Sequence, residues 1–252
     1  NESGAKYPVE VAILKDNVLL TIDTSGSGLN RRGYRLAQGE APIKETLAAS
    51  LIRLANWKGD TPLIDPFCGS GTIAIEACLI AQNIAPGFNR EFVSEQWNIM
   101  PANIYDDYRD EADKMADYDK EIEVYASDID PEMIEIAKRN AEEVGLSDII
   151  KFSVKDVNTL TIDTEEPVAL IGNPPYGERI GDREEVEEMY RYIGKLMKQH
   201  PFLSTYILTS NKEFEYLVDR KATKRRKLFN GYIECTYYQY WSKKTERKTI
   251  EN

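Results

Sequence analysis

The sequence predicts an α/β protein whose mostly parallel sheet ends in an antiparallel hairpin. Short apolar runs alternate with helical patterns from about residue 41 onward, as in parallel strands joined by crossover helices. A glycine-rich turn lies between the first of these strands and its helix. Near the C-terminus, Asn230-Gly231 separates two β-like runs and predicts the final hairpin.

The length and composition are those of a globular protein with one main core. The chain has 252 residues, of which 42% are hydrophobic and 30% are charged. No apolar run approaches the roughly 18 residues that a membrane span needs, and no signal peptide opens the chain. We therefore expect a cytoplasmic protein with no membrane partner.

Cysteine and histidine are too few for most metal or nucleophile chemistry. Cys68, Cys78 and Cys235 have no metal-ligand spacing, so we expect buried, reduced thiols. His200, the single histidine, precedes a proline at the expected end of a helix. This argues against serine-hydrolase triads and histidine-rich zinc sites, and no metal is expected.

Charge is distributed unevenly along the chain. The net charge is −11, yet residues 212–252 carry 11 basic against 6 acidic residues, and residues 1–211 carry 21 against 37. A basic end on an acidic body can orient a nucleic acid but cannot bind it strongly alone. We infer that affinity for such a partner would come from another domain. The oligomeric state is not determined by the sequence, with a monomer or weak dimer expected.

Residues 1–28 are expected to be the remnant of an upstream region. Two β-like runs, 9–14 and 18–22, flank a turn-type cluster, and residues 24–30 form a polar connector. A lone hairpin of this size is marginal by itself. Because the chain starts with Asn rather than Met, we interpret it as the back part of a longer protein, with a catalytic domain at 29–252.

The catalytic domain is expected to contain helices and strands in regular alternation. Residues 84–121 break this rhythm with aromatic residues among many acids, and we interpret them as a helical insertion. The other expected elements are a helix beginning at Pro42, a strand at 62–65, a helix at 72–82, a strand at 123–128, a helix at 131–144, strands at 149–154 and 168–171, a helix at 186–200, a strand at 205–208, a short helix at 212–218, and hairpin strands at 224–229 and 232–240.

The glycine-rich turn is a candidate nucleoside-cofactor loop, although a plain tight turn would have the same pattern. Glycines let backbone N–H groups approach a ligand, and the following helix N-terminus adds partial positive charge. An acid directly before the glycines would repel a pyrophosphate but could face an amino-acid group, which favours S-adenosylmethionine (SAM) over NAD. The candidate residues are Asp65, Phe67, Cys68, Gly69, Ser70, Gly71 and Thr72.

Two acids after the next strands complete the candidate cofactor site. Asp128, followed by Ile129, could accept hydrogen bonds from both ribose hydroxyls, because Asp130 is better placed to cap the next helix. Asp156, followed by Val157, could accept a hydrogen bond from an adenine amino group. A solvated turn acid is the simple alternative for Asp156.

The stretch Asn173-Pro174-Pro175-Tyr176 is a candidate clamp for an amine on a planar substrate. It follows a strand, where open α/β sheets bind their ligands. The Asn173 side-chain oxygen and the Pro174 carbonyl could accept both protons of an –NH₂ group and turn its lone pair toward a methyl donor. Tyr176 would stack on the substrate ring, which is worth about 1–3 kcal/mol per base. The alternative is a proline-stiffened turn with a packed tyrosine.

The order of these two motifs resembles the Rossmann-like, SAM-dependent amino-methyltransferases. Further motifs make the chain similar to the THUMP-domain-containing RNA guanine-N2 methyltransferases, a bacterial family that includes an enzyme acting on 23S ribosomal RNA. The motifs that carry this resemblance are Arg32-Gly-Tyr-Arg35, Ala41-Pro-Ile-Lys-Glu-Thr46, Asp65–Gln82 with Asn83-Ile-Ala-Pro-Gly87, and Asn173–Arg179.

This resemblance implies methyl transfer from SAM to the N2 amine of a guanine in RNA. It implies a seven-stranded sheet and an N-terminal RNA-binding THUMP domain, of which residues 1–28 would be the linking end. Pro42, Lys44 and Thr46 would border the methionine end of SAM, and the basic run 224–227 would contact RNA phosphates.

Several related activities share the clamp. Adenine-N6 DNA methyltransferases and glutamine-N5 methyltransferases of release factors have it, but Gly177-Glu-Arg179 and the motif at 32–35 favour the RNA guanine family. Guanine-N2 methylation of tRNA is the rival that shares nearly every motif. An inactive SAM- or RNA-binding scaffold is the non-enzymatic alternative, although a scaffold has no need for the intact clamp.

Overall fold

A seven-stranded sheet forms the centre of the molecule, in the order β5-β4-β3-β6-β7-β9-β8. The structure, a computed structural model, describes residues 4–35, 43–176 and 182–242. Strands β5, β4, β3, β6 and β7 are parallel, whereas β9 is antiparallel to both β7 and β8. The expected fold class is therefore confirmed. The strands are β3 (Leu63–Asp65), β4 (Val124–Asp128), β5 (Ile150–Val154), β6 (Val168–Gly172), β7 (Leu203–Thr209), β8 (Lys224–Asn230) and β9 (Ile233–Tyr240).

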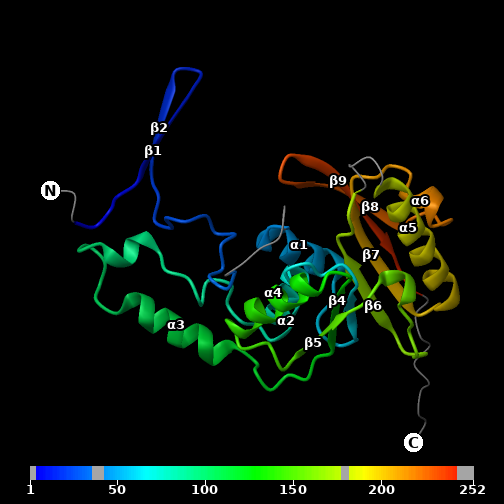
Figure 1. Cartoon of the computed structure of the whole chain (residues 1–252). Coiled ribbons are helices and arrows are strands. Elements are labelled where there is room, and N and C mark those ends of the chain that lie inside the picture. Colours follow the sequence, from blue (N-terminus) through cyan, green and yellow to red (C-terminus); the bar gives the residue numbers. More distant parts are fainter. Residues whose placement is uncertain (1–3, 36–42, 177–181, 243–252) are drawn as a thin grey trace, which may run out of the picture.

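Helices cover both faces of this sheet and bury one apolar cluster on each (Figure 1). Helices α1, α2 and α4 pack on one face, and α5 and α6 pack on the other. Helix α2 is buried along nearly its whole length, as expected where a helix lies between a sheet and another helix. The helices of the two layers are α1 (Glu45–Ala55), α2 (Thr72–Ala81), α4 (Pro131–Glu142), α5 (Asp182–Gln199) and α6 (Phe214–Leu217).

The strand order reverses at β3, and this reversal determines where a ligand can bind. The chain moves outward from β3 to β4 and β5, then returns to place β6 on the other side of β3. The connection after β3 runs toward β4 and the connection after β6 runs toward β7, in opposite directions, so a crevice opens at the carboxyl ends of β3 and β6. Both candidate motifs follow these two strands directly.

The C-terminal hairpin has a register that differs by one residue from the sequence expectation. Asn230 still pairs with Ile233, so the two turn residues are Gly231 and Tyr232 rather than Asn230 and Gly231. Gly231 has φ 62°, a left-handed value that glycine adopts without a steric penalty. As a result, the Asn230 side chain belongs to strand β8 and not to the exposed turn.

The N-terminal hairpin projects away from the sheet (Figure 1). Strands β1 (Val9–Leu14) and β2 (Asn17–Ile22) pair antiparallel, and every residue in both is exposed, apolar ones included. Residues 84–121 lie beside the base of this hairpin and contain a 3₁₀ helix (Val93–Gln96) and α3 (Ile104–Met115). There, the Trp97 ring stacks on Tyr7 with centroids 4.9 Å apart.

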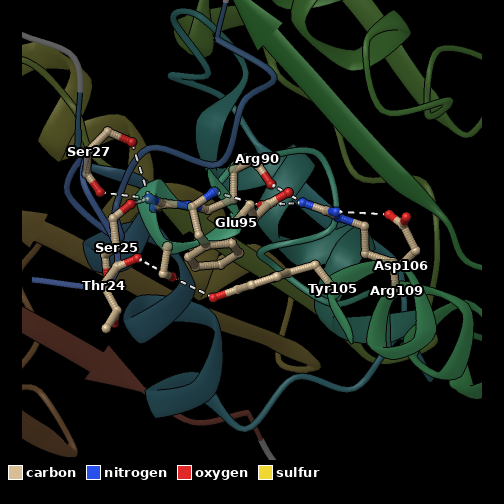
Figure 2. Close-up of polar contacts among 10 residues, drawn as sticks. Thr24, Ser25, Ser27, Arg90, Glu95, Tyr105, Asp106 and Arg109 are labelled. Atoms are coloured by element: carbon tan, nitrogen blue, oxygen red, sulfur yellow. Dashed lines mark hydrogen bonds and ion pairs between the residues drawn. The ribbon is translucent and has the colours of Figure 1, made fainter. Parts of the chain in front are cut away.

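Arg90 fastens the segment after the hairpin to the region 84–121 (Figure 2). This side chain is buried, and its Nη1 donates hydrogen bonds to the carbonyls of Gly28 at 3.0 Å and Arg31 at 3.2 Å. Its Nη2 donates to the carbonyls of Ser27 at 2.7 Å and Ser25 at 3.2 Å. One guanidinium thus donates hydrogen bonds to four backbone carbonyls of an irregular segment, which does not pair with a strand.

Neighbouring side chains support the same attachment (Figure 2). The Ser94 hydroxyl donates to the Thr24 carbonyl at 2.8 Å. Arg109 of α3 donates to the Arg90 carbonyl at 3.1 Å and forms an ion pair with Glu95 at 2.6 Å. The region 84–121 therefore supplies a platform for the N-terminal segment.

Some chemical features are absent from the described part of the chain. All three cysteines are buried and free there, as expected from the sequence. Within residues 4–35, 43–176 and 182–242, no cluster of acidic, histidine or cysteine side chains has the arrangement of a metal site. In these same ranges, no helix combines the length and the hydropathy that a bilayer crossing requires.

Replacing Arg90 with alanine should release the N-terminal segment while the sheet stays folded. Several carbonyls would lose a charged donor, which costs about 2 kcal/mol or more. Hydrogen exchange should then show faster exchange at residues 24–31 and little change in β3–β6. Arg139→Ala, at an exposed position on α4, is the control. Unchanged exchange at 24–31 would show that Arg90 does not hold this segment.

Candidate functional site

A cavity of about 260 Å³ opens at the carboxyl ends of the parallel strands. The glycine-rich loop after β3, the acids after β4 and β5, and the clamp after β6 all contribute to its wall. The lining residues are Ile43, Pro66, Phe67, Cys68, Gly69, Ser70, Thr72, Ile73, Asp128, Ile129, Met133, Lys155, Asp156, Val157, Asn173, Pro175 and Met189.

The glycine loop has the backbone that only glycine adopts easily. Gly69 and Gly71 have φ values of 49° and 84°, and Gly71 is the N-cap residue of α2. A Cβ on Gly71 would lie 3.0 Å from the Cβ of Ala137 in α4. Gly71 therefore allows both the turn and the close packing of α2 against α4, which directs the α2 N-terminus toward the cavity.

Asp128 connects the end of β4 to the glycine loop. Its Oδ2 accepts a hydrogen bond from the Gly69 N–H at 2.9 Å, and its Oδ1 accepts one from the Asp130 N–H at 3.0 Å. Asp130 caps α4 by accepting from the Glu132 N–H at 2.8 Å, which confirms its expected role as the helix cap. Each Asp128 oxygen has a further lone pair, so the ribose role stays a prediction.

Asp65 is a buried carboxyl group beneath the cavity. Its side chain has no exposed surface, and only Oδ1 accepts a hydrogen bond, from the Phe67 N–H at 3.3 Å. Oδ2 is buried without a partner. Burial, aided by the negative charge of Asp128, raises the pKa of Asp65 to about 8.

Ion pairs hold the segment 32–35 over α1 and α2. Arg35 pairs with Glu45 at 3.0 Å and donates to the Thr72 hydroxyl at 2.9 Å. Glu76, buried inside α2, accepts from the Tyr34 hydroxyl at 3.0 Å, and burial raises its pKa. This segment therefore packs against the N-terminal half of α2.

Asp156 follows β5 and faces the cavity from its far end. Its Oδ1 accepts from the Asn158 N–H at 2.9 Å, which caps the short 3₁₀ helix Val157–Thr159. Capping uses only one of the two carboxylate oxygens, so both the adenine contact and the turn role expected from the sequence stay open.

The clamp lies against the same cavity as the glycine loop. Asn173 and Pro175 line it, whereas Pro174 is buried. The Tyr176 hydroxyl donates to Asn173 Oδ1 at 2.6 Å, and its ring packs against the buried cluster of α1 and α2. Burial raises the pKa of this hydroxyl, so it keeps its proton at neutral pH. Stacking of Tyr176 on a substrate ring stays a prediction.

The cavity joins most of the residues expected from sequence but not all of them. Lys44 and Thr46 are exposed near the start of α1, and Pro42 lies outside the described residues. The predicted residues that lie near the cavity without lining it are Asp65, Gly71, Pro174 and Tyr176. Residues that sequence reasoning missed are Ile43, Pro66, Ile73, Met133, Lys155 and Met189. Lys155 and Met133 are close in sequence to Asp156 and Asp128, whereas nothing in the pattern of α5 distinguishes Met189.

The fold and this site together define a class of enzyme. The sheet has five parallel strands and a terminal antiparallel hairpin, and a glycine loop follows its central strand. Three acids surround this loop: Asp128 contacts it, Asp156 follows the next strand, and Asp65 is buried with one oxygen that has no partner. This set fits a nucleoside that carries a cationic amino-acid group. These are the features of a Rossmann-like, SAM-dependent methyltransferase, and SAM is its cofactor.

Comparison with known proteins identifies the family. The family model described as RMKL-like, methyltransferase domain matches residues 32–239, so the chain belongs to that family. A Bacillus subtilis (strain 168) protein, YpsC, with the provisional name of an RNA methyltransferase, is 55% identical over the whole chain. The ribosomal RNA large subunit methyltransferase K/L of Shewanella frigidimarina (strain NCIMB 400) is 39% identical over 93% of it.

A solved structure in complex with a cofactor product has the same fold. SMU.472, provisionally described as a methyltransferase and bound to SAH, superposes with a TM-score of 0.91 and 42% identity over 97% of the chain. The chain spans 65% of the length of YpsC, 34% of the Shewanella enzyme and 64% of the SMU.472 chain.

Cofactor binding should release a proton from Asp65. Below about pH 8 this group is mostly neutral in the free protein, and a bound ammonium group would favour the carboxylate. SAM affinity should therefore rise with pH by up to about tenfold per unit, between about pH 6 and 7.5. Above that range the α-amino group of the cofactor, with a pKa of about 8, loses its own charge.

Isothermal titration calorimetry at neutral pH, in two buffers with different ionisation enthalpies, measures this proton directly. The Asp65→Asn variant should bind SAM more weakly and release no proton from this site. Equal proton release by the wild type and the variant would show that another group is responsible.

Replacing Asp128 with alanine should weaken SAM binding while the protein stays folded. The variant loses the predicted ribose acceptor and the hydrogen bond to the Gly69 N–H, so an increase in Kd of about tenfold or more is expected. Asp130→Ala is the matched control, because it removes a nearby carboxylate that caps α4 and does not line the cavity. Unchanged affinity in Asp128→Ala would remove Asp128 from the cofactor site.

Proposed function

We propose that the protein transfers a methyl group from SAM to the exocyclic N2 amine of a guanine in RNA, with 23S ribosomal RNA as the substrate. The observation that carries this proposal is that Asn173 and Pro175 line the same cavity as Gly69 and Asp128. An amine held by the clamp would therefore lie beside the methyl donor held by the loop. This arrangement suits direct transfer to nitrogen.

The clamp would activate the amine by orienting it. Bound SAM supplies an electrophilic methyl group. The Asn173 oxygen and the Pro174 carbonyl would accept the two N–H protons and turn the nitrogen lone pair toward that methyl group. A proton becomes acidic only as positive charge develops on nitrogen, so no general base is needed before attack. The Cys68 thiol does not compete with the substrate amine for the methyl group, because burial raises the pKa of the thiol and keeps it neutral.

RNA as the substrate class has support from the relatives and from the distribution of charge. The names of YpsC and of the Shewanella enzyme describe RNA methyltransferases. The basic run 224–227 lies on β8, the exposed edge strand of the sheet, although Arg225 and Lys227 form ion pairs with Glu215 and Glu234. A partly neutralised edge agrees with our expectation that strong RNA binding requires a further domain.

Replacing Asn173 with alanine should strongly reduce methyl transfer and leave SAM binding nearly unchanged. The substrate amine would lose its main acceptor, so a decrease in kcat of about 100-fold or more is expected. Asn89→Ala, at an exposed position away from the cavity, is the control. An equal loss of transfer and of SAM affinity would mean that Asn173 only supports the loop.

The substrate is identified by a transfer assay with methyl-labelled SAM on unmodified ribosomal RNA, tRNA and DNA. The chain should be tested alone and joined to the expected N-terminal RNA-binding domain. Mass spectrometry of the nucleosides should give N2-methylguanosine from ribosomal RNA. The same nucleoside from tRNA would change the substrate, and N6-methyladenine from DNA would overturn the proposal. SAM binding without any transfer would indicate a scaffold.

A further inference from the structure

Two hydrogen bonds connect the tip of the C-terminal hairpin to the clamp. Asn230 Nδ2 donates to the Tyr176 hydroxyl at 3.1 Å, and this hydroxyl donates to Asn173 Oδ1 at 2.6 Å. Asn230 is 54 residues away from Tyr176 in the sequence. It is the last residue of β8 that pairs with β9, so its backbone is fixed by the sheet.

The direction of these two hydrogen bonds determines which atom Asn173 presents. An amide –NH₂ group can only donate, and a tyrosine hydroxyl has one proton to give. Because the Tyr176 oxygen accepts from Asn230, its own proton is directed to Asn173. Asn173 must then place its oxygen, rather than its –NH₂ group, on this side. A carbonyl oxygen accepts two hydrogen bonds, so one lone pair is left for a substrate amine.

We propose that Asn230 is a positioning residue, which acts through Tyr176 to keep the Asn173 side-chain oxygen oriented as an acceptor. This inference rests on the proposed function, since only an amine substrate requires an acceptor there. The two ends of an asparagine amide have almost the same shape, so packing alone does not distinguish them. In this structure the Asn230 amide presents its Nδ2 to the Tyr176 hydroxyl, and this polarity is passed on to Asn173. We call these two hydrogen bonds the relay.

The surroundings of the relay keep it in place. The Tyr176 ring packs against the buried cluster that includes Cys235 and Tyr237 of β9, and the Cys235 thiol is a further neighbour of its hydroxyl. Burial raises the pKa of Tyr176, so the hydroxyl does not lose the proton that it donates. The hairpin and the clamp are therefore joined by packing as well as by the two hydrogen bonds.

The Asn230→Asp variant tests the relay, because it keeps the shape of the side chain and converts a donor into an acceptor. The Tyr176 proton would turn to the new carboxylate, and Asn173 would lose the contact that fixes its amide. With in vitro transcribed ribosomal RNA and labelled SAM, kcat should fall about tenfold or more. The Kd of SAM should change less than about twofold, because Asn230 does not line the cavity.

A double-mutant cycle separates a relay from a merely structural effect. In a Tyr176→Phe background the hydroxyl is absent, so Asn230→Asp should cause no further loss of kcat. Asn230→Ala removes the donor without adding charge. It should also reduce kcat in the wild-type background and leave kcat unchanged in the Tyr176→Phe background. It serves in place of Asn230→Asp if that variant is unstable. Asn89→Asp makes the same chemical change at an exposed site and should leave kcat unchanged.

The outcomes distinguish the relay from the proposed function. An unchanged kcat in both Asn230 variants, or an equal loss in the wild-type and Tyr176→Phe backgrounds, would overturn the relay while methyl transfer by the wild type stands. If the wild-type protein bound SAM but methylated no RNA, the proposed function would fail, and the relay with it.

Discussion

The reversal of strand order at β3 is the constraint on which the site depends. Because β4 and β6 flank β3 on opposite sides, no crossover among the described residues covers the carboxyl ends of β3 and β6. The glycine loop leaves β3 at that point, and the clamp leaves β6 next to it. Asp128 then joins the neighbouring strand to the loop through the Gly69 N–H. The topology thus places the glycine loop and the clamp side by side.

Two carboxyl groups that are costly to bury, Glu76 of α2 and Asp65 of β3, are compensated differently. Glu76 is held by Arg32 and Tyr34, which explains in physical terms a motif first noticed only by its resemblance to a family. Asp65 has no such partner, and its pKa is raised instead. Its Oδ2 is buried without a hydrogen-bond partner, and the predicted partner is the cationic group of the cofactor.

Local patterns predicted the sheet, the loops and the acids of the site because each is encoded by adjacent residues. Asn173 to Tyr176 and Asp65 to Thr72 are continuous in the sequence, so their chemistry was visible there. Contacts between distant segments were not. Arg90 gives no sign that it binds the segment 24–31, and Met189 resembles any apolar helix position. The turn at Asn230 was predicted one residue early, and this single shift hid the contact with Tyr176.

The attachment of the N-terminal segment by Arg90 has a geometric consequence. Because the four carbonyls are fixed to the region 84–121, the base of the β1–β2 hairpin stands at a set distance from the cavity. Any macromolecule held at the hairpin would reach the cavity only with a nucleotide at the matching separation. If RNA is the substrate, as proposed above, the distance along the folded RNA would then contribute to the choice of the target nucleotide.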